Sequence, residues 1–465
     1  MEAFHLPGLP DVPTTEQRYG SGDAGTALHL PVLTPALLER QVDALIAARR
    51  IHLADRPISR IIEIIDHVAG RFQDGQDPLR VTAESLLPAV TGYSLPMVRA
   101  ILDGMAADWR TSVLEKLLAS EFADPRVLDG FIASPTSGRT HVIAPDLITH
   151  IFSGNVPGVA VTSLVRALLV KSASLGKTAE REPILPVLFA RGISEADAGL
   201  GECLAIAYWP GGDVPLESVA FARAGAVVAY GGNDAVESIR RRTPARARFI
   251  GYGNKLSLAV LGRSALTSGR APEVARLVAR DVALFDQHGC VSPHVVYAED
   301  GGEISPMEWT EMLAAVMAEL EAELPRGALG AGEATAIRQL RAEAEFAQLA
   351  GSGLILHTSD DGTAWTVLYD PDPTFSASCL NRVVRVKAVS DLDRVITHLE
   401  PLGGLLQTMG MEVDDARRDS LAKRFAELGV SRICQPGTMA WTPPSWHHDG
   451  RPPLRDLVRW CDIED

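Results

Sequence analysis

Hydrophobic and polar positions divide the chain into successive regimes, the first of which covers residues 1–135. Apolar residues recur there at helical spacing over 58–72 and 95–122. Thr34 followed by Pro35 is typical of a helix start, because threonine caps the free N–H groups and proline suits the first helical position. We therefore predict a helical N-terminal region that is associated with the next domain.

The second regime, residues 136–262, has short apolar segments separated by helical patterns. The expected strands are 147–152, 168–171, 204–209, 226–230 and 249–250. Strands that alternate with helices predict a doubly wound parallel sheet, which binds ligands at the carboxyl ends of its strands. We expect an α/β nucleotide-binding domain here.

The third regime, residues 263–432, predicts a second α/β domain. Helices are expected at 273–285, 306–323 and 333–349, and strands near 295–296, 365–368 and 383–386. A tail at 433–465, rich in proline and tryptophan, has too little periodicity to form a domain. We expect it to return to the nucleotide-binding domain or to lie in an oligomer interface.

Composition narrows the classes of function. With 465 residues, 46% apolar and 22% charged, the chain is large enough for two or three globular domains. Its net charge of −15 disfavours nucleic acid as a partner. The sequence has no run of eighteen apolar residues, which a membrane span would need. The acidic residues and prolines near its start are unlike a signal peptide. We expect a cytoplasmic protein with reduced thiols.

Cys290 is the candidate nucleophile among five cysteines. It lies between Gly289 and a Ser-Pro turn, a setting that favours presentation of the thiol over packing. A buried and inert thiol is the commoner fate of a single cysteine, so this position alone does not decide the matter.

The ends of the expected strands carry the other candidates. Asn155 offers a neutral donor to a developing oxyanion, although a turn-capping role is the commoner one for such an asparagine taken alone. Lys171 places a cation where a ribose or phosphate would lie, whereas most lysines are simply solvated. Glycines that end a strand and precede a helix allow phosphate to approach the backbone; these are the turns Gly211-Gly212 and Gly232-Asn233.

Taken in order, these segments resemble the aldehyde dehydrogenase superfamily and, more closely, its LuxC-type acyl-CoA reductase family. The motifs that carry the resemblance are residues 153–157, 287–294, 435–439, 446–450 and 457–464. The resemblance implies an aldehyde dehydrogenase-like fold. It also implies that Cys290 is the nucleophile, Asn155 an oxyanion donor, Lys171 a ligand of the cofactor ribose, and Gly232-Asn233 the pyrophosphate turn.

Two departures from the superfamily pattern bear on the reaction. Where hydrolytic members have Glu-Leu-Gly-Gly-Lys, with a glutamate that activates water, this chain has Gly251-Tyr-Gly-Asn-Lys255. An acyl-enzyme would then be hydrolysed poorly, which favours reduction of a thioester over oxidation of an aldehyde. The segment Glu-x-Phe-Gly-Pro, which holds the nicotinamide ribose, is replaced by residues 379–383.

The reaction expected from the resemblance is reduction of an acyl-CoA, fatty acyl above all, to the aldehyde through acyl-Cys290. NADPH is preferred over NADH, because the position of the superfamily's ribose-binding glutamate is occupied by Ser174. No metal is required. The expected partners are acyl-CoA or an acyl-donor protein, with an acyl transferase or synthetase beside them, and the chain is expected to form a homo-oligomer.

Two alternatives stay open at this point. A cysteine acyltransferase or hydrolase would use Cys290 without a nucleotide, and an acyl-handing subunit would keep the fold without redox turnover.

The histidines that flank the nucleophile, His288 and His294, either assist catalysis or make structural hydrogen bonds. His447, His448 and Asp449 could pass for metal ligands, but a hydrogen-bonded loop explains them better.

Overall fold

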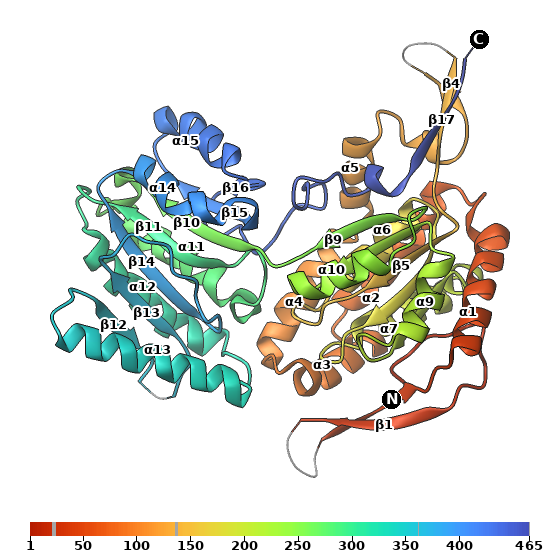
Figure 1. Ribbon diagram of the computed structural model, residues 1–465, viewed down its shortest axis with the longest axis horizontal. Helices are drawn as coiled ribbons and strands as arrows, with labels where there is room; N and C mark the ends of the chain where they lie inside the picture. Colours follow the sequence, from red (N-terminus) through yellow and green to blue (C-terminus); the bar gives the residue numbers. More distant parts are fainter. Residues whose placement is uncertain (21–24, 135–137, 361, 465) are drawn as a thin grey trace. The chain divides into compact units, whose positions relative to one another are not determined.

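The computed structural model describes residues 1–20, 25–134, 138–360 and 362–464. It divides into two compact units, each with its own predominantly parallel central sheet (Figure 1). The first unit comprises Met1–Thr91, Val98–Gly253 and Pro443–Asp465, and the second comprises Gly92–Met97 and Asn254–Thr442. The domain boundary expected at residue 135 lies outside the described residues.

The central sheet of the first unit has five parallel strands in the order β7-β6-β5-β8-β9. The strands are β5 (Leu147–Ile151), β6 (Ala173–Thr178), β7 (Leu204–Tyr208), β8 (Ala226–Tyr230) and β9 (Arg248–Tyr252). The strand order reverses between β5 and β8, so the chain winds outwards in both directions from that point. In sheets of this type the ligand crevice lies at the reversal, outside the carboxyl ends of the strands.

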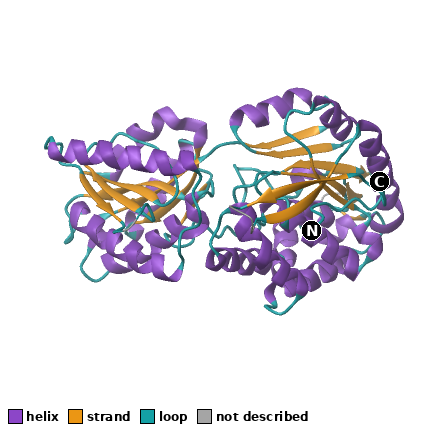
Figure 2. Cartoon of the chain, turned by 90° about the horizontal axis from the view of Figure 1, so that it is seen from below, coloured by secondary structure: helices purple, strands orange, loops and turns teal. Residues whose placement is uncertain are grey.

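Helices of the first unit cover both faces of this sheet, as Figure 2 shows. They are α1 (Pro35–Ala48), α2 (Ile58–Gln73), α3 (Pro78–Thr91), α4 (Leu95–Asp108), α5 (Thr111–Glu121), α6 (Val159–Leu169), α7 (Leu185–Ala196), α8 (Ala198–Gly201), α9 (Val214–Ala222) and α10 (Asn233–Arg242). The helical N-terminal region is thus confirmed, and Thr34 caps α1 by accepting a hydrogen bond from Leu37 N.

Two small antiparallel sheets of the first unit were not predicted. One is the hairpin of β1 (Thr14–Tyr19) and β2 (Thr26–Pro31). In the other, β4 (Arg139–Ile143) lies between β3 (Ile132–Ala133) and β17 (Arg459–Ile463) from the tail. The pairing of β4 with β17 joins segments more than 300 residues apart, which no local pattern indicates.

The expected strand at 168–171 is wrong. Residues Val159–Leu169 form the helix α6, and the strand that follows is β6. Helix α6 is buried on nearly all sides, so its apolar residues form no stripe that would reveal a helical period. The strand β6 carries Ser174, Lys177 and Thr178, which hide it in a hydropathy pattern.

The second unit has a seven-stranded sheet in the order β12-β13-β14-β11-β10-β15-β16. All neighbouring pairs are parallel except β12 with β13. The strands are β10 (Leu256–Leu261), β11 (Pro293–Glu299), β12 (Ile355–Thr358), β13 (Thr366–Asp370), β14 (Val383–Val389), β15 (Leu406–Glu412) and β16 (Arg432–Cys434).

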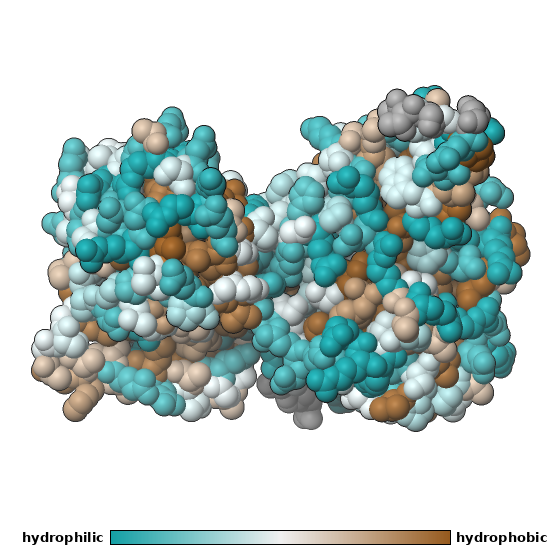
Figure 3. Space-filling view, turned by 45° about the horizontal axis from the view of Figure 1, so that its top comes forward, coloured by the Kyte–Doolittle hydropathy of each residue, from teal (hydrophilic) through white to brown (hydrophobic). Residues whose placement is uncertain are grey.

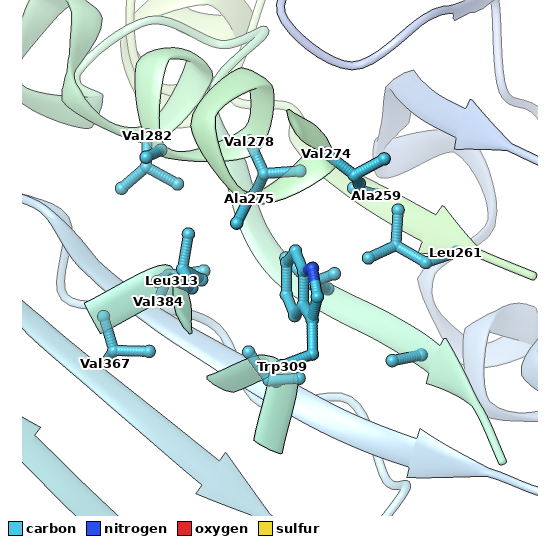
Figure 4. Packing of buried hydrophobic residues seen from close by; sticks show 14 of the residues in the cluster. Ala259, Leu261, Val274, Ala275, Val278, Val282, Trp309, Leu313, Val367 and Val384 are labelled. Atoms are coloured by element: carbon cyan, nitrogen blue, oxygen red, sulfur yellow. The ribbon is translucent and has the colours of Figure 1, made fainter. Parts of the chain in front are cut away.

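Helices also cover both faces of the second sheet. They are α11 (Ala271–Ala283), α12 (Pro306–Glu323), α13 (Ala331–Leu349), α14 (Val395–Leu399) and α15 (Asp415–Glu427). On one face, α11 and α12 pack with the sheet around the fully buried Trp309 (Figure 4). Helix α12 begins with a capping box in which Ser305 and Glu308 each accept a hydrogen bond from the other's backbone N–H.

The surface agrees with the acidic, globular composition. Hydrophilic residues (teal) cover much of the face in Figure 3, and hydrophobic ones are scattered among them. Among the residues that the structure describes, every helix falls short of the length and apolarity that a bilayer span requires.

Candidate active site

Cys290 lies in the turn between the 3-10 turn η4 (Leu284–Gln287) and β11. Its backbone carbonyl accepts a hydrogen bond from Ser257 Oγ at 2.6 Å. Ser257 is fully buried at an irregularity in the pairing of β10 with its neighbours. Cys290 itself is half-buried, so a fixed backbone supports a residue that still has access to solvent. A nucleophilic thiol requires this combination.

Gly289 lets the Cys290 turn close tightly. A Cβ at this position would lie 3.2 Å from both Phe285 Cδ2 and Ser292 Oγ, which is tighter than an ordinary contact. Ser292 N donates to Gly289 O at 2.9 Å. A larger residue at position 289 would therefore require the Phe285 or Ser292 side chain to shift by a few tenths of an ångström.

The three residues before His288 adopt a left-handed backbone. Their φ values are 56° at Phe285, 47° at Asp286 and 66° at Gln287. Such a conformation costs about 1–3 kcal/mol per residue and persists only where surrounding contacts enforce it. The Gln287 carboxamide supplies part of that enforcement, because Nε2 donates to Pro293 O and Val383 O at 2.8 Å and Oε1 accepts from Val383 N at 2.9 Å.

A second left-handed turn, at Leu380, Asn381 and Arg382, is bonded to the first one. The φ values of these residues are 65°, 57° and 64°. Asn381 N donates to Asp286 O at 3.1 Å, and Asn381 Oδ1 lies 2.9 Å from His288 Nε2. This second turn belongs to the segment 379–383, which replaces the superfamily's ribose-binding motif. Its contacts connect it to the nucleophile turn.

Buried charges connect the same two turns. Arg382, 1% exposed, donates from Nε to Asp286 Oδ1 at 2.9 Å and from Nη1 to Glu321 Oε2 at 2.8 Å. The other Asp286 oxygen, Oδ2, accepts from Gly327 N at 3.0 Å. Removing one partner of such a buried ion pair lowers the stability of the fold, because the remaining charge is not solvated. The network therefore stabilises both left-handed turns.

The two histidines beside the nucleophile have different environments. His294 is buried, and its Nδ1 accepts a hydrogen bond from Ser378 N at 3.2 Å. Burial lowers the pKa of His294 to about 4, so this ring is neutral near pH 7. His288 is half-buried and packs edge to face with Tyr93, with ring centroids 6.4 Å apart.

Three of the remaining cysteines have thiols that burial keeps protonated. Burial raises the pKa of Cys203 to about 12 and also raises the pKa values of Cys379 and Cys434. A protonated thiol is a poor nucleophile. These three cysteines are therefore poor competitors for an acyl group.

In the first unit, most of the predicted strand-end residues lie at the carboxyl edge of the sheet. Asn155 follows β5, the turn Gly211-Gly212 follows β7, and Gly232-Asn233 follows β8. Because the strands are parallel, these positions share one edge, and β5 and β8 flank the point of reversal. The structure thus brings Asn155, Gly232 and Asn233 to the expected crevice edge.

The turn after β8 suits a phosphate group. Gly232 is the N-cap residue of the ten-residue helix α10, and no side chain at this position caps the N–H groups of the first turn. A Cβ at Gly232 would have open space around it, so a ligand can approach the backbone. Backbone N–H groups at a helix N-terminus bind phosphate oxygens, and a dinucleotide phosphate therefore fits here.

Lys171 and Ser174 do not lie at this edge. Lys171 precedes β6 at its amino end, where its buried Nζ pairs with Asp129 Oδ1 at 2.6 Å. Ser174 is buried within β6, and its Oγ lies 3.2 Å from His150 Nε2. The expectation that both occupy a strand's carboxyl end is therefore corrected, because the strand begins after Lys171 instead of ending there.

The carboxyl end of β6 carries other polar residues. Lys177 is 7% exposed, and its Nζ lies 5.7 Å from the centre of the Tyr208 ring. Burial lowers the pKa of Lys177, while Glu217 opposes that shift. The exposed Glu180 and Arg181 follow, and Glu180 Oε1 accepts from Gln17 Nε2 at 3.1 Å. Glu180 and Arg181 are absent from the predicted site residues, because the hydropathy pattern placed the strand before residue 172. Recognising the helix at 159–169 would have moved the strand to 173–178 and put these two residues after its carboxyl end.

The tail adds an aromatic stack to the same edge. His448 stacks on Tyr252, the last residue of β9, with ring centroids 4.1 Å apart. Trp446 stacks on His448 at 4.6 Å, and Tyr230, the last residue of β8, stacks on Tyr252 at 4.9 Å. His448 is thus a packing residue here. Over the described part of the chain, no three His, Cys, Asp or Glu side chains gather as a metal site.

Comparison with known proteins identifies relatives that match most of the chain. A "Long-chain acyl-protein thioester reductase" of Aliivibrio fischeri is 26% identical over 435 residues, which is 90% of this chain and 85% of that protein. The protein of the same name from Vibrio harveyi is 24% identical over 428 residues, covering 89% of this chain and 84% of the relative.

Solved structures with the same fold include aldehyde dehydrogenases. Aldehyde dehydrogenase 21 from Physcomitrella patens superposes with a TM-score of 0.75 at 13% identity, covering 98% of this chain and 95% of that chain. The Delta-pyrroline-5-carboxylate dehydrogenase from Mycobacterium tuberculosis, bound with NAD, gives 0.72 at 16% identity, covering 100% and 90%. The predicted aldehyde dehydrogenase-like fold is thus confirmed. Residues 53–460 match the acyl-CoA reductase (LuxC) family, and the chain belongs to that family.

Proposed function

We propose that this protein reduces the acyl group of a thioester to an aldehyde. The observation that carries the proposal is the Cys290 turn, whose backbone is fixed by Ser257 while the residue stays half-buried. Membership of the acyl-CoA reductase family supports it. The relatives named above are long-chain acyl-protein thioester reductases, which supports a long acyl chain delivered by a protein or by CoA.

The proposed reaction begins at the Cys290 thiolate, which attacks the thioester carbonyl. The tetrahedral adduct expels the donor thiolate, which takes up a proton, and acyl-Cys290 remains. The acyl carbon then accepts a hydride and its oxygen a proton, giving a thiohemiacetal on Cys290. Loss of the hydroxyl proton and cleavage of the C–S bond then release the aldehyde and regenerate the thiolate. For Asn155 we propose the oxyanion-donor role that the family resemblance implies.

The proposed hydride source is a nicotinamide dinucleotide, which supplies two electrons when bound. The open turn at Gly232 and the N-terminus of α10 support binding of its pyrophosphate. Lys177 and Arg181 would meet a 2′-phosphate, whereas Glu180 would accept hydrogen bonds from a ribose hydroxyl. Of these three charged groups near the end of β6, two are cations and one is a carboxylate, and that carboxylate already accepts a hydrogen bond from Gln17. We therefore propose NADPH over NADH. Ser174 does not support this preference, because it is buried against His150.

Purified protein supplied with acyl-CoAs of graded length, or with an acylated carrier protein, tests the proposal. We expect NADPH to be consumed in equal amounts with aldehyde formed. Release of free fatty acid without consumption of NADPH would favour the hydrolase alternative and overturn the proposal. Acyl transfer to a second thiol without aldehyde would instead favour the acyl-handing subunit.

A further inference from the structure

A cavity of about 460 Å³ lies at the amino edge of the sheet in the first unit. This edge is opposite to the one that carries Gly232 and Asn233, because all five strands are parallel. Its walls come from the ends of α1 and β4, the starts of β8, β9 and β17, and the segments beside them. The volume is in the range of small-molecule sites, which are usually concave pockets of this size.

The cavity is lined by four arginines and one carboxylate. The arginines are Arg49, Arg246, Arg248 and Arg459, and the carboxylate is Asp146. Asp146 is already paired, since its Oδ1 accepts from Arg49 Nη1 at 2.7 Å. Three guanidinium groups are therefore left with positive charge that the cavity itself does not neutralise.

Two of these guanidinium groups are held by backbone carbonyls instead of acids. Arg248 Nη1 donates to Val458 O at 3.0 Å and also to Asp456 O, and Arg246 Nη2 donates to Ala222 O. Among the described residues, no carboxylate lies within ion-pair distance of Arg246, Arg248 or Arg459. A carbonyl orients a guanidinium without cancelling its charge, so the remaining N–H groups can bind an anion.

The rest of the wall is apolar and closely packed. It includes Ile143, Pro145 and Leu457. Gly225 approaches Pro145 so closely that a Cβ at Gly225 would lie 2.4 Å from Pro145 Cβ, and Arg248 N donates to Gly225 O at 2.9 Å. An apolar wall beside two oriented cations suits a ligand with a phosphate at one end and a flat ring at the other.

We propose that this cavity binds a phosphate-bearing small molecule of nucleotide size. The ligand's phosphate would lie among Arg246, Arg248 and Arg459, and its ring would lie against the apolar wall. The phosphate could come from a free nucleotide or from the nucleotide end of CoA, which share this chemistry. The site is separate from the proposed cofactor edge and does not depend on the proposed reaction.

Calorimetric titration of the full-length protein tests the assignment. The probes are inorganic pyrophosphate, ADP, CoA and dephospho-CoA. The double variant Arg246→Gln/Arg248→Gln removes two of the cations. The control is Arg241→Gln, which removes the same charge from α10 outside the cavity, where Arg241 pairs with Glu237. A further variant, Arg181→Gln, measures how much of the signal comes from the carboxyl edge of the sheet. Circular dichroism checks that each variant folds.

We expect pyrophosphate binding to weaken by about tenfold or more in the double variant, and with rising salt, but not in the Arg241→Gln control. Tighter binding of ADP than of pyrophosphate would show that the apolar wall meets a nucleoside. CoA binding more tightly than dephospho-CoA would identify CoA as the source. Equal pyrophosphate binding by wild type and double variant would overturn the proposal, as would binding of an oligoglutamate peptide without any phosphate probe.

Discussion

The ring Nε2 of His288 lies 2.9 Å from Oδ1 of Asn381, although 93 positions separate the two residues. This contact connects the nucleophile turn to the segment 379–383. We predict that Asn381→Gly slows acylation of Cys290 by about tenfold, a loss of roughly 1.4 kcal/mol, because glycine keeps the left-handed backbone but removes the partner of His288. The measurement is the rate of thiol release from an acyl-CoA.

Asn381→Asp is the matched control, because aspartate keeps an oxygen at the same place and tolerates a positive φ. We expect it to restore most of the rate. Equal rates for Asn381→Gly and wild type would mean that the contact is only structural.

The buried pair of Arg382 and Asp286 predicts a large effect on stability. Arg382→Met leaves the Asp286 charge without its partner and should destabilise the second unit by about 3–5 kcal/mol. Denaturant titration with a probe in that unit measures it. The control, Arg418→Met, breaks an exposed pair with Asp415 and should cost less than about 1 kcal/mol. Equal midpoints for the two variants would contradict the role given to the buried network.

Local patterns in the sequence predicted the fold well and the site only in part. Strands such as β8 and helices such as α12 have clear periods and flanking signals, so their positions could be predicted. Helix α6 is buried on nearly every side, so its pattern did not reveal where the helix ends and β6 begins. Lys171 was therefore expected at the carboxyl end of a strand, where it would contact the cofactor ribose. The contacts of Asp286 with Arg382, 96 positions apart, depend on two left-handed turns that no local pattern indicates.

The position of β6 gives a test of cofactor choice. Arg181→Gln should raise the Michaelis constant for NADPH more than for NADH, because a cation near a 2′-phosphate is lost. Glu180→Gln should act in the opposite direction by removing a repelling carboxylate. Ser174→Ala is the control, and it should leave the ratio unchanged because Ser174 is buried against His150. A ratio that changes with Ser174 alone would return the ribose site to that residue.

The buried His294 makes stability depend on pH. Its pKa is lowered to about 4 in the fold from an ordinary 6.5, so the unfolded chain takes up the proton first as the pH falls. The stabilisation from neutral His294 is thus fully present above about pH 6.5 and is lost as the pH falls through 4. His294→Gln, which can still accept from Ser378 N, should reduce the acid-induced loss of stability by about 1–3 kcal/mol between pH 7 and 4. Thermal unfolding at a series of pH values measures this, and parallel curves for variant and wild type would contradict it.

The central claim is that Cys290 carries the acyl group during turnover, and intact-protein mass spectrometry tests it directly. Wild-type protein is mixed with a long-chain acyl-CoA in the absence of reduced cofactor, and then NADPH is added. We predict one acyl adduct per chain, which maps to Cys290 after digestion and disappears as aldehyde forms when NADPH is added. Cys290→Ala should form no adduct, whereas Cys203→Ala should behave like wild type because burial keeps that thiol protonated. An adduct that persists in Cys290→Ala, or aldehyde formation by that variant, would contradict the account.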